Sequence, residues 1–521
     1  MKCWILLLLI CFFNLSLKAQ SSSLLSDGIA DYIRRSQLTG KLETDRSLAV
    51  NSFSSNLEAV DTLFRNSTST ILKKSNIRLL PISETTQYNS KTGYGRNNGA
   101  MIPSAGFQGA ISAGFTATIG NFSIQLKPEW LMAQNNAYET FSTAQYAYYW
   151  NIYYKWLNKI DNPESFGTEA YNKILLGQSH VEYNFKKVAV GFSNENLWWG
   201  PGRYNALIMS NNAEGFLHAT IHTTSPITSN WGSIEGQLIS GKLQNSNILP
   251  PDHYRYDNGQ LLYKPKPLES RYLHGIIASF QPKIAKGLFL GFSLVNYGYN
   301  ASNNETMGSM FARYVMPKDH AEIYIEYGRN DKMPTPMNLA VENGYPRAFV
   351  AGLRKLIPLH SKRESFIELA AEFTQLQLPT SRLTLDSNAN SWYTSSSVQH
   401  GYTNNGKIIG AGIGPGSNSE TIAISYLKGF NKIGVEFERY VHNNDFYYNA
   451  YSYVKDFTRH WVDVSTCFVG SYRYKHLVLN GKLGFIRSIN YEWNTLEGLG
   501  YFTNGYDLFN VHANIALSYH F

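Results

Sequence analysis

Cysteine is almost absent from this chain of 521 residues, which contains only Cys3, Cys11 and Cys467. The first two lie within residues 1–19, where a basic start precedes an apolar run from Trp4 to Phe13 and Ala19 offers a small residue for cleavage. We predict that residues 1–19 are a secretory signal that is removed. Cys467 would then be the one cysteine of the mature chain, and an internal disulfide is excluded.

Long hydrophobic runs are also missing. After residue 19 there is no stretch of 18 or more apolar residues, which excludes transmembrane helices from the prediction. Basic clusters are missing too, and without a recognised nucleic-acid motif we expect no nucleic-acid partner. Without Lys2 and Lys18 of the signal, the 46 Lys and Arg residues become 44, against 38 Asp and Glu, a net charge of +6. Such an excess favours an acidic polymer or lipopolysaccharide as partner.

The sequence offers little catalytic chemistry. His218 and His222 are four residues apart without an intervening Glu, and in a strand their rings would lie about 13 Å apart. The glycine-rich run 410–416 lacks the Lys-Ser/Thr of a phosphate loop. There is no Gly-x-Ser-x-Gly elbow. We therefore predict no catalytic residue, no cofactor and no metal ion.

What the sequence does contain is a regular alternation of apolar and polar residues. From Phe509 to Phe521 every odd position is apolar and every even position is polar or small. A strand with this two-residue period has one apolar face and one polar face, and a terminal aromatic residue suits a membrane–water interface. The aromatic content of 14% also suits interfacial girdles or sugar-stacking surfaces. The pattern predicts an integral, multi-pass β-barrel in the outer membrane of a Gram-negative bacterium, with Tyr519 and Phe521 at its closure.

Hairpins of this design recur along the chain. Two-residue turns are predicted between Ile119 and Phe122, Phe185 and Val188, Phe430 and Ile433, and Tyr474 and Leu477. They are typical of the periplasmic ends of barrel hairpins. The longer polar stretches 245–259, 330–345 and 387–405 are predicted extracellular loops. At about 10 residues per strand, the barrel over residues 101–521 would have roughly 16 to 20 antiparallel strands.

Residues 20–100 are different and are predicted to be a periplasmic segment with short helices. Leu25, Ile29, Tyr32 and Ile33 have helical spacing, and Gly40 can end this helix. A second short helix is predicted around residues 57–64. We place the segment beside or beneath the barrel; a mostly disordered tail is the alternative.

Alternation stops in the run from Asn194 to Phe216 (NENLWWGPGRYNALIMSNNAEGF). Backbone that leaves the ladder inside a barrel must be buried in protein or line water. We therefore expect this run to fold into the lumen or across its mouth.

The same run suggests sugar binding, because ring faces stack on sugar C–H surfaces and planar polar groups bond paired hydroxyls. The candidate polysaccharide-binding residues are Trp198, Trp199, Arg203, Asn205, Asn211 and Asn212, with a second set, Asp445, Tyr447 and Tyr448, at a predicted extracellular loop. Gly200, Pro201, Gly202, Gly215 and Phe216 form the structural motif of the run. For both tryptophans and for Gly200 and Gly202 we favour a packing or turn-shaping role over ligand contact.

The run also closely resembles the capsule-assembly Wzi family of outer-membrane barrels. The resemblance is carried by residues 195–202 (ENLWWGPG), 207–212, 215–216, 235–241 (EGQLISG), 413–415 (IGP) and 459–463 (RHWVD). It implies an 18-stranded barrel with periplasmic helices and a lumen closed by loops, acting as a lectin that holds capsular polysaccharide on the cell surface. The helical part is shorter here than the family's bundle, which puts helix-mediated contact with the export machinery in doubt.

The function that we predict is non-catalytic binding that attaches or organises capsular or surface polysaccharide. The expected partners are this polysaccharide, outer-membrane lipid and lipopolysaccharide, the barrel assembly machinery and polysaccharide export components, and the protein is expected to be a monomer. The main alternative is a diffusion channel for small solutes, which needs an open lumen. An outer-membrane hydrolase acting on lipid or glycan is the third hypothesis.

Overall fold

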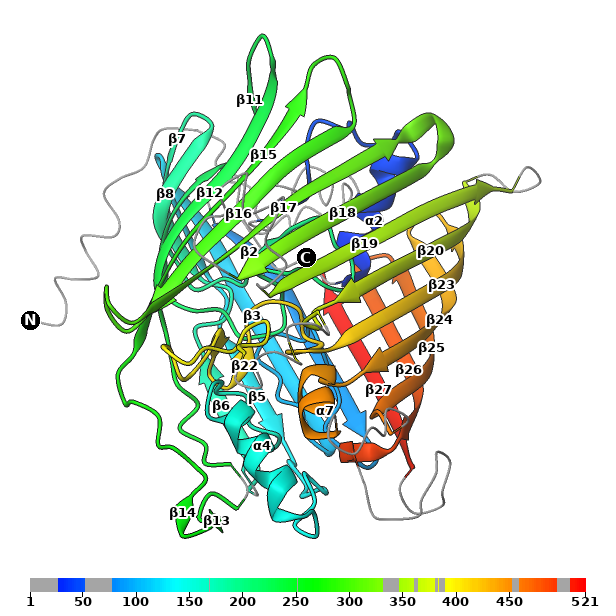
Figure 1. The fold of residues 1–521 in the computed structure, drawn as a ribbon. Coiled ribbons are helices and arrows are strands. Elements are labelled where there is room, and N and C mark those ends of the chain that lie inside the picture. Colours follow the sequence, from blue (N-terminus) through cyan, green and yellow to red (C-terminus); the bar gives the residue numbers. More distant parts are fainter. Residues whose placement is uncertain are drawn as a thin grey trace, which may run out of the picture.

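The computed structural model describes residues 27–51, 77–167, 169–250, 252–330, 346–359, 364–379, 383, 389–451, 459–493 and 507–521. Its main feature is a closed antiparallel β-barrel (Figure 1). The wall contains β2 (Ile77–Asn89), β3 (Gly106–Ile119), β4 (Phe122–Leu126), β5 (Glu129–Ala133), β6 (Tyr171–Leu175), β7 (His180–Phe185), β8 (Val188–Ser193), β10 (His218–Thr223), β11 (Ile227–Thr228), β12 (Gly232–Leu243), β15 (Arg271–Pro282), β16 (Leu288–Gly298), β17 (Asn304–Met316), β18 (Ala321–Asn330), β19 (Arg347–Pro358), β20 (Ser365–Gln375), β23 (Asn418–Lys428), β24 (Asn431–Val441), β25 (Val462–Tyr474), β26 (Leu477–Ile489) and β27 (Leu508–Tyr519).

Three spanning strands are interrupted. The first consists of β4 and β5, which both pair with β3. The second consists of β6 and β7, which pair with β5 and β4. The third consists of β10 and β11, which both pair with β12. Pro128 lies in the first break, where it has no N–H to give to the ladder. With each interrupted pair taken as one strand, the described residues form 18 spanning strands, which confirms the predicted fold class.

The alternation of residues along each strand places apolar side chains on the outer face of the wall and polar side chains toward the lumen. On β18, Ile323 and Ile325 are about half exposed on the outer face, whereas Glu322, Tyr324 and Glu326 are buried toward the lumen. On β27, Phe509, Ile515, Leu517 and Tyr519 are exposed and His512 is buried, as the sequence predicts. A closed ladder satisfies the backbone within the wall while an apolar face meets hydrocarbon. No helix among the described residues is long and apolar enough to cross a membrane.

Three of the four predicted tight turns are confirmed by their strand registers, in which Ile119 faces Phe122, Phe185 faces Val188 and Tyr474 faces Leu477. The fourth is wrong by two residues. Lys428 pairs with Asn431, so the turn is Gly429–Phe430 and Gly429 adopts a φ of +57°. Glycine takes this left-handed conformation without the steric cost of a Cβ. The shift by two keeps every side chain on its predicted face.

The barrel begins before residue 101, which corrects the predicted boundary. β2 pairs with β3 on one side and with β27 on the other, so the seam joins the first and last strands of the wall. Tyr519 lies in this seam, opposite Ile82 of β2 and Leu477 of β26. Phe521 follows β27, with its ring centroid 5.2 Å from that of Tyr519.

The predicted first helix exists as α2 (Asp27–Leu38). Its position differs from the prediction, because α2 lies within the barrel near the end with the tight turns, which we call the tight-turn end (Figure 1). Ile29 and Ile33 pack on Phe430 and Val478 of the wall, and Leu38 packs among other wall residues. Its apolar face therefore finds a partner in the lumen rather than outside the barrel. The second predicted helix, around 57–64, lies outside the described residues.

The opposite end, which we call the loop end, carries α4 (Ala147–Leu157) and α7 (Asn444–Tyr451) (Figure 1). Shorter elements are β1 (Val50–Asn51), β9 (Trp198–Trp199), β13 (Tyr256–Asp257), β14 (Gln260–Leu261), β21 (Thr403–Asn404), β22 (Lys407–Ile408), η3 (Pro317–Asp319) and η4 (Tyr491–Trp493). Of the predicted loops, 245–259 joins β12 to β15, 330–345 lies almost wholly outside the described residues, and 389–405 turns inward. Trp392, Tyr393 and Tyr402 of that loop are fully buried.

Candidate functional site

The run 194–216 crosses the interior of the barrel. It leaves the wall after Ser193 of β8 and rejoins it at His218 of β10, and these two residues face each other in the ladder. Within it, β9 pairs with β1, so that Trp199 lies opposite Val50. We call residues 194–216 the luminal segment. The prediction that alternation stops here is confirmed by its largely irregular backbone.

One carboxylate of the wall holds the centre of the luminal segment. Glu372 of β20 accepts hydrogen bonds from the backbone N–H groups of Arg203, Tyr204 and Asn205, at 2.6 to 3.1 Å. It also accepts one from the Tyr324 hydroxyl at 2.8 Å. Charge-assisted bonds of this kind are stronger than neutral ones. The segment is therefore fastened to the wall through its backbone as well as through its side chains.

Glycine makes this approach possible. A Cβ on Gly202 would overlap the carbonyl oxygen of Asn205, and one on Gly200, whose φ is +123°, would lie 2.7 Å from Glu326 Oε2. Gly215 leaves similar room beside Asn194 and Glu195. Pro201 and Phe216 are buried. These contacts explain why bulkier residues would not fit in this part of the luminal segment.

Arg203 joins the luminal segment to α2. Its Nη1 is 3.3 Å from Glu368 Oε1 on the wall, and its Nη2 is 3.6 Å from Asp31 Oδ1 of α2. Arg354 and Lys432 of the wall pair with the same two carboxylates. Burial would raise the pKa of Asp31, but these cations hold it well below its usual value. Asp31 is therefore charged at neutral pH. Arg203 is already paired with two carboxylates of the protein.

The predicted polar candidates divide by exposure. Asn205 and Asn212 are buried, with Asn205 Nδ2 3.2 Å from Thr374 Oγ1 and Asn212 Nδ2 2.9 Å from the carbonyl of Ile408. Asn211 is half-buried and donates to the Asn97 carbonyl at 3.0 Å. Asn205 and Asn212 thus have protein partners in the interior, and their predicted role as glycan contacts stays a prediction.

The two tryptophans also divide. Trp199 is fully buried, and its Nε1 donates to Gln237 Oε1 at 3.0 Å. This is the packing role favoured from the sequence. Trp198 is half-buried.

Tyr393 of the inward loop 389–417 donates to the Leu207 carbonyl at 2.7 Å and accepts from Ala411 N–H at 2.6 Å. The luminal segment and this inward loop thus form one packed core inside the barrel.

The second predicted set lies on α7 at the loop end. Asp445 is buried and accepts from Leu378 N–H at 2.9 Å, and burial raises its pKa to about 7 although hydrogen bonds oppose the shift. Tyr447 is fully buried and accepts from Arg459 N–H, whereas Tyr448 keeps partial exposure. Asp445 and Tyr447 therefore support the loop end from within, and their role as glycan contacts stays a prediction.

Sequence reasoning missed a set of exposed tyrosines on and beside α4. α4 packs on α7 through an aromatic cluster that includes Trp150, Tyr153 and Phe446. Outside this cluster, the described part of the loop end has four tyrosines that are 50% to 67% exposed: Tyr146, Tyr148, Tyr254 and Tyr256. We call these four residues the tyrosine platform. The sequence signal was the density of Tyr in 146–154 and 254–256, which alternation did not register because neither stretch is a wall strand.

Two contacts join the halves of the platform. Arg255 lies over the Trp150 ring at 4.4 Å and donates to the Thr143 carbonyl at 3.2 Å. Asn151 of α4 donates to Asp257 Oδ2 at 3.0 Å. The segment 254–257, which carries Tyr254 and Tyr256, is thereby held against the helix that carries Tyr148. Exposed rings next to amide, guanidinium and carboxylate groups can stack on sugars and bond their hydroxyls.

Comparison with known proteins agrees with this architecture. Residues 90–298 match the family model of the capsule assembly protein Wzi. Wzi of Escherichia coli, described as an outer membrane protein involved in group 1 capsule assembly and a carbohydrate-binding β-barrel, has 11% identity and a TM-score of 0.61, over 97% of this chain and 100% of that one. OccAB2 of Acinetobacter baumannii has 11% identity and a TM-score of 0.43, over 87% and 99% of the two chains. No curated protein matches the chain.

The family resemblance predicted from the sequence is confirmed over residues 90–298. At 11% identity the structural likeness concerns the fold. The closed barrel with its apolar outer face is that of an integral outer-membrane protein, as predicted.

Proposed function

We propose that the protein, whose residues 90–298 match the family model of the capsule assembly protein Wzi, binds surface polysaccharide at its loop end without catalysing a reaction. The observation that carries the proposal is the filled interior. The luminal segment, α2 and the inward loop are bonded to the wall and to one another. A barrel occupied in this way supports a binding role over a diffusion channel.

The tyrosine platform is the surface that we propose for the glycan. Its rings are exposed at the loop end, whereas five of the nine residues proposed from the sequence are buried, namely Trp199, Asn205, Asn212, Asp445 and Tyr447. Trp198, Arg203, Asn211 and Tyr448 keep partial exposure and remain secondary candidates. By acting after export, the protein would attach or organise polymer at the cell surface.

The partners follow from this role. Capsular or other surface polysaccharide is the proposed ligand, supplied by export components, and lipopolysaccharide is the proposed neighbour in the outer leaflet. We further propose that the barrel assembly machinery inserts the protein and that it acts as a monomer.

The test measures binding of purified protein, in detergent, to polysaccharide extracted from the same cells. Replacing both Tyr254 and Tyr256 with Ala removes half of the tyrosine platform. An aromatic contact contributes about 0.5–1.5 kcal/mol, so two contacts predict roughly a 5- to 150-fold loss of affinity. Tyr472→Ala with Tyr474→Ala is the matched control, because these tyrosines are 53% and 56% exposed near the tight-turn end.

Equal affinity of the platform variant and the control would refute the platform as the glycan surface. Single-channel recording addresses the alternative function. Large, stable openings of the unmodified protein in planar bilayers would contradict the filled interior and favour a diffusion channel.

A further inference from the structure

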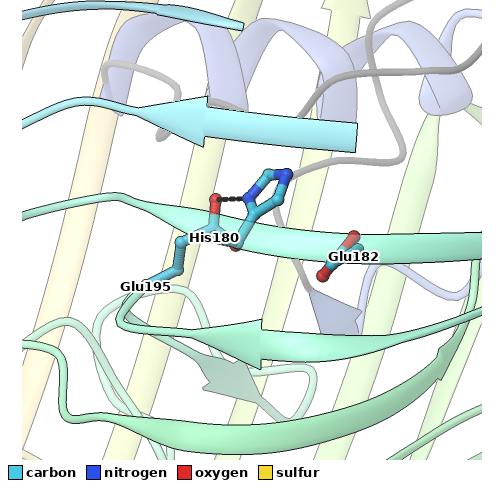
Figure 2. Close-up of side chains that lie close together, drawn as sticks. All are labelled: His180, Glu182 and Glu195. Carbon is cyan, nitrogen blue, oxygen red and sulfur yellow. Dashed lines mark ion pairs between the residues drawn. The ribbon is translucent and has the colours of Figure 1, made fainter. Parts of the chain in front are cut away.

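A cluster of histidine and carboxylate side chains lies on the inner face of β7, β8 and β10. His180 and Glu182 alternate on β7 and are buried, whereas Val181 between them is exposed on the outer face. Glu195 follows β8 as the second residue of the luminal segment (Figure 2). His222 lies on β10, in the ladder opposite Ala189 of β8. Four potential metal ligands thus come from three neighbouring parts of the chain.

Three of the four ligands already lie close together. His180 Nδ1 is 3.2 Å from Glu195 Oε1, the ion pair drawn in Figure 2. One ligand atom from each of His180, Glu182 and Glu195 lies within 4.8 Å of the other two. In tetrahedral zinc coordination the ligand atoms are roughly 3.3–3.6 Å apart, given bonds of about 2.0–2.2 Å. Side-chain rotation would have to bring the three ligand atoms to this spacing around an ion.

His222 provides an independent observation. It is 3% exposed, and neither ring nitrogen has a hydrogen-bond partner among the described residues. Its Nδ1 is 3.8 Å from Glu182 Oε1, beyond a hydrogen bond but directed at the cluster. A buried polar ring without partners is costly, and a metal bond would satisfy one nitrogen.

A glycine makes room for the cluster. Gly191 of β8 faces Glu182 across one ladder and Thr220 across the other. A Cβ on Gly191 would lie 2.8 Å from Glu182 Cγ. Because position 191 has no side chain, Glu182 can lie across β8 toward β10. The local sequence therefore allows a carboxylate from β7 to approach His222.

We propose that His180, Glu182, Glu195 and His222 bind one divalent transition-metal ion of the zinc class. Imidazole nitrogens favour zinc, copper or nickel over calcium and magnesium, and two carboxylates balance the charge of the ion. The ion would tie the start of the luminal segment to the wall at β7 and β10. The sequence prediction of no metal considered His218 with His222 along one strand; here the partners of His222 come from β7 and the luminal segment.

The test uses the full-length protein without a histidine tag, in detergent, after removal of metal with a chelator. Zinc chloride is titrated while bound zinc is measured by mass spectrometry and calorimetry. We expect one zinc per chain and a loss of affinity of at least about 100-fold in His222→Ala, because even outer-shell partners of a metal contribute 10- to 100-fold. Glu182→Gln should act in the same direction.

The matched control is His512→Ala on β27, which removes another buried luminal histidine, bonded through Nδ1 to Asn89 at 2.8 Å. Zinc binding of this variant should equal that of the unmodified protein. Heat-modifiable migration checks that each variant has a folded barrel. Absence of zinc from the unmodified protein, or binding that is equal in His222→Ala, Glu182→Gln and the control, would overturn the proposal. Either result leaves the proposed glycan role intact.

Discussion

Arg354 of β19 donates from Nη2 to Asp31 Oδ1 of α2 at 2.7 Å, which joins the barrel wall to a helix 323 residues earlier in the chain. Arg203 of the luminal segment approaches the same oxygen. One carboxylate therefore links the wall, the helix and the luminal segment. This charge adds to the apolar packing of Ile29, Ile33 and Leu38 that places α2 inside the barrel.

Asp31→Asn should loosen α2. The change leaves the charges of Arg354 and Arg203 without one of their partners, and breaking a buried pair destabilises by about 3–5 kcal/mol. Hydrogen–deuterium exchange over residues 27–38 should accelerate. Because the folded pKa of Asp31 is depressed, its contribution is present above the usual pKa near 4 and is lost as pH falls below it.

The control for this change is Glu364→Gln, which removes the pair between Lys41 and Glu364, whose side chains are 40% and 51% exposed. Exposed pairs contribute about 0–1 kcal/mol, so exchange over α2 should hardly change. Equal exchange in Asp31→Asn and the unmodified protein would show that the ionic contact does not hold the helix.

Gly202→Val should disrupt the luminal segment, since even a Cβ overlaps the Asn205 carbonyl. We expect faster proteolysis within residues 194–216 of membrane-inserted protein.

Arg203→Ala should loosen α2 and accelerate hydrogen–deuterium exchange over residues 27–38, because the partners of Arg203 are Asp31 and Glu368. An unchanged glycan affinity per folded molecule would remove Arg203 from the secondary candidates, whereas a tenfold loss would support it as a direct contact.

Stability near α7 should fall as pH rises from about 4 to about 7. Burial raises the folded pKa of Asp445 to about 7, so the folded protein binds more protons than the unfolded chain in this window. The contribution is at most about 4 kcal/mol. After correction for intrinsic rates, exchange over 444–451 should be faster at pH 8 than at pH 5. Asp445→Asn should abolish the difference; the same pH dependence in that variant would refute the assignment.

Deleting Tyr519 to Phe521 should impair assembly, because it removes the residue that faces both Ile82 and Leu477 at the seam. The yield of heat-modifiable, membrane-inserted protein reports this. Phe521→Tyr keeps an aromatic ring and should assemble normally. Normal insertion of the truncated chain would contradict a role for these residues in closure.

The sequence predicted the wall well because alternation is a local pattern. β27 and three tight turns follow from the order of apolar and polar residues alone. The location of α2 did not follow, because helical spacing identifies an apolar face but not the surface that covers it. In the same way, Trp-rich and Asn-rich stretches suggested sugar contacts, and only the long-range partners of Trp199 and Asn212 show that these side chains are buried.

The interior and the wall differ in how far apart in the sequence their contacting residues lie. Along the wall, hydrogen bonds mostly join strands that are consecutive in sequence, with the β2–β27 seam as the long closure. The interior joins residues such as Arg34 and Glu322, 288 positions apart, and Arg203 and Glu368, 165 positions apart. Contacts of long range form slowly because loop closure costs entropy. A gel shift that reports a closed wall therefore does not by itself report a docked interior.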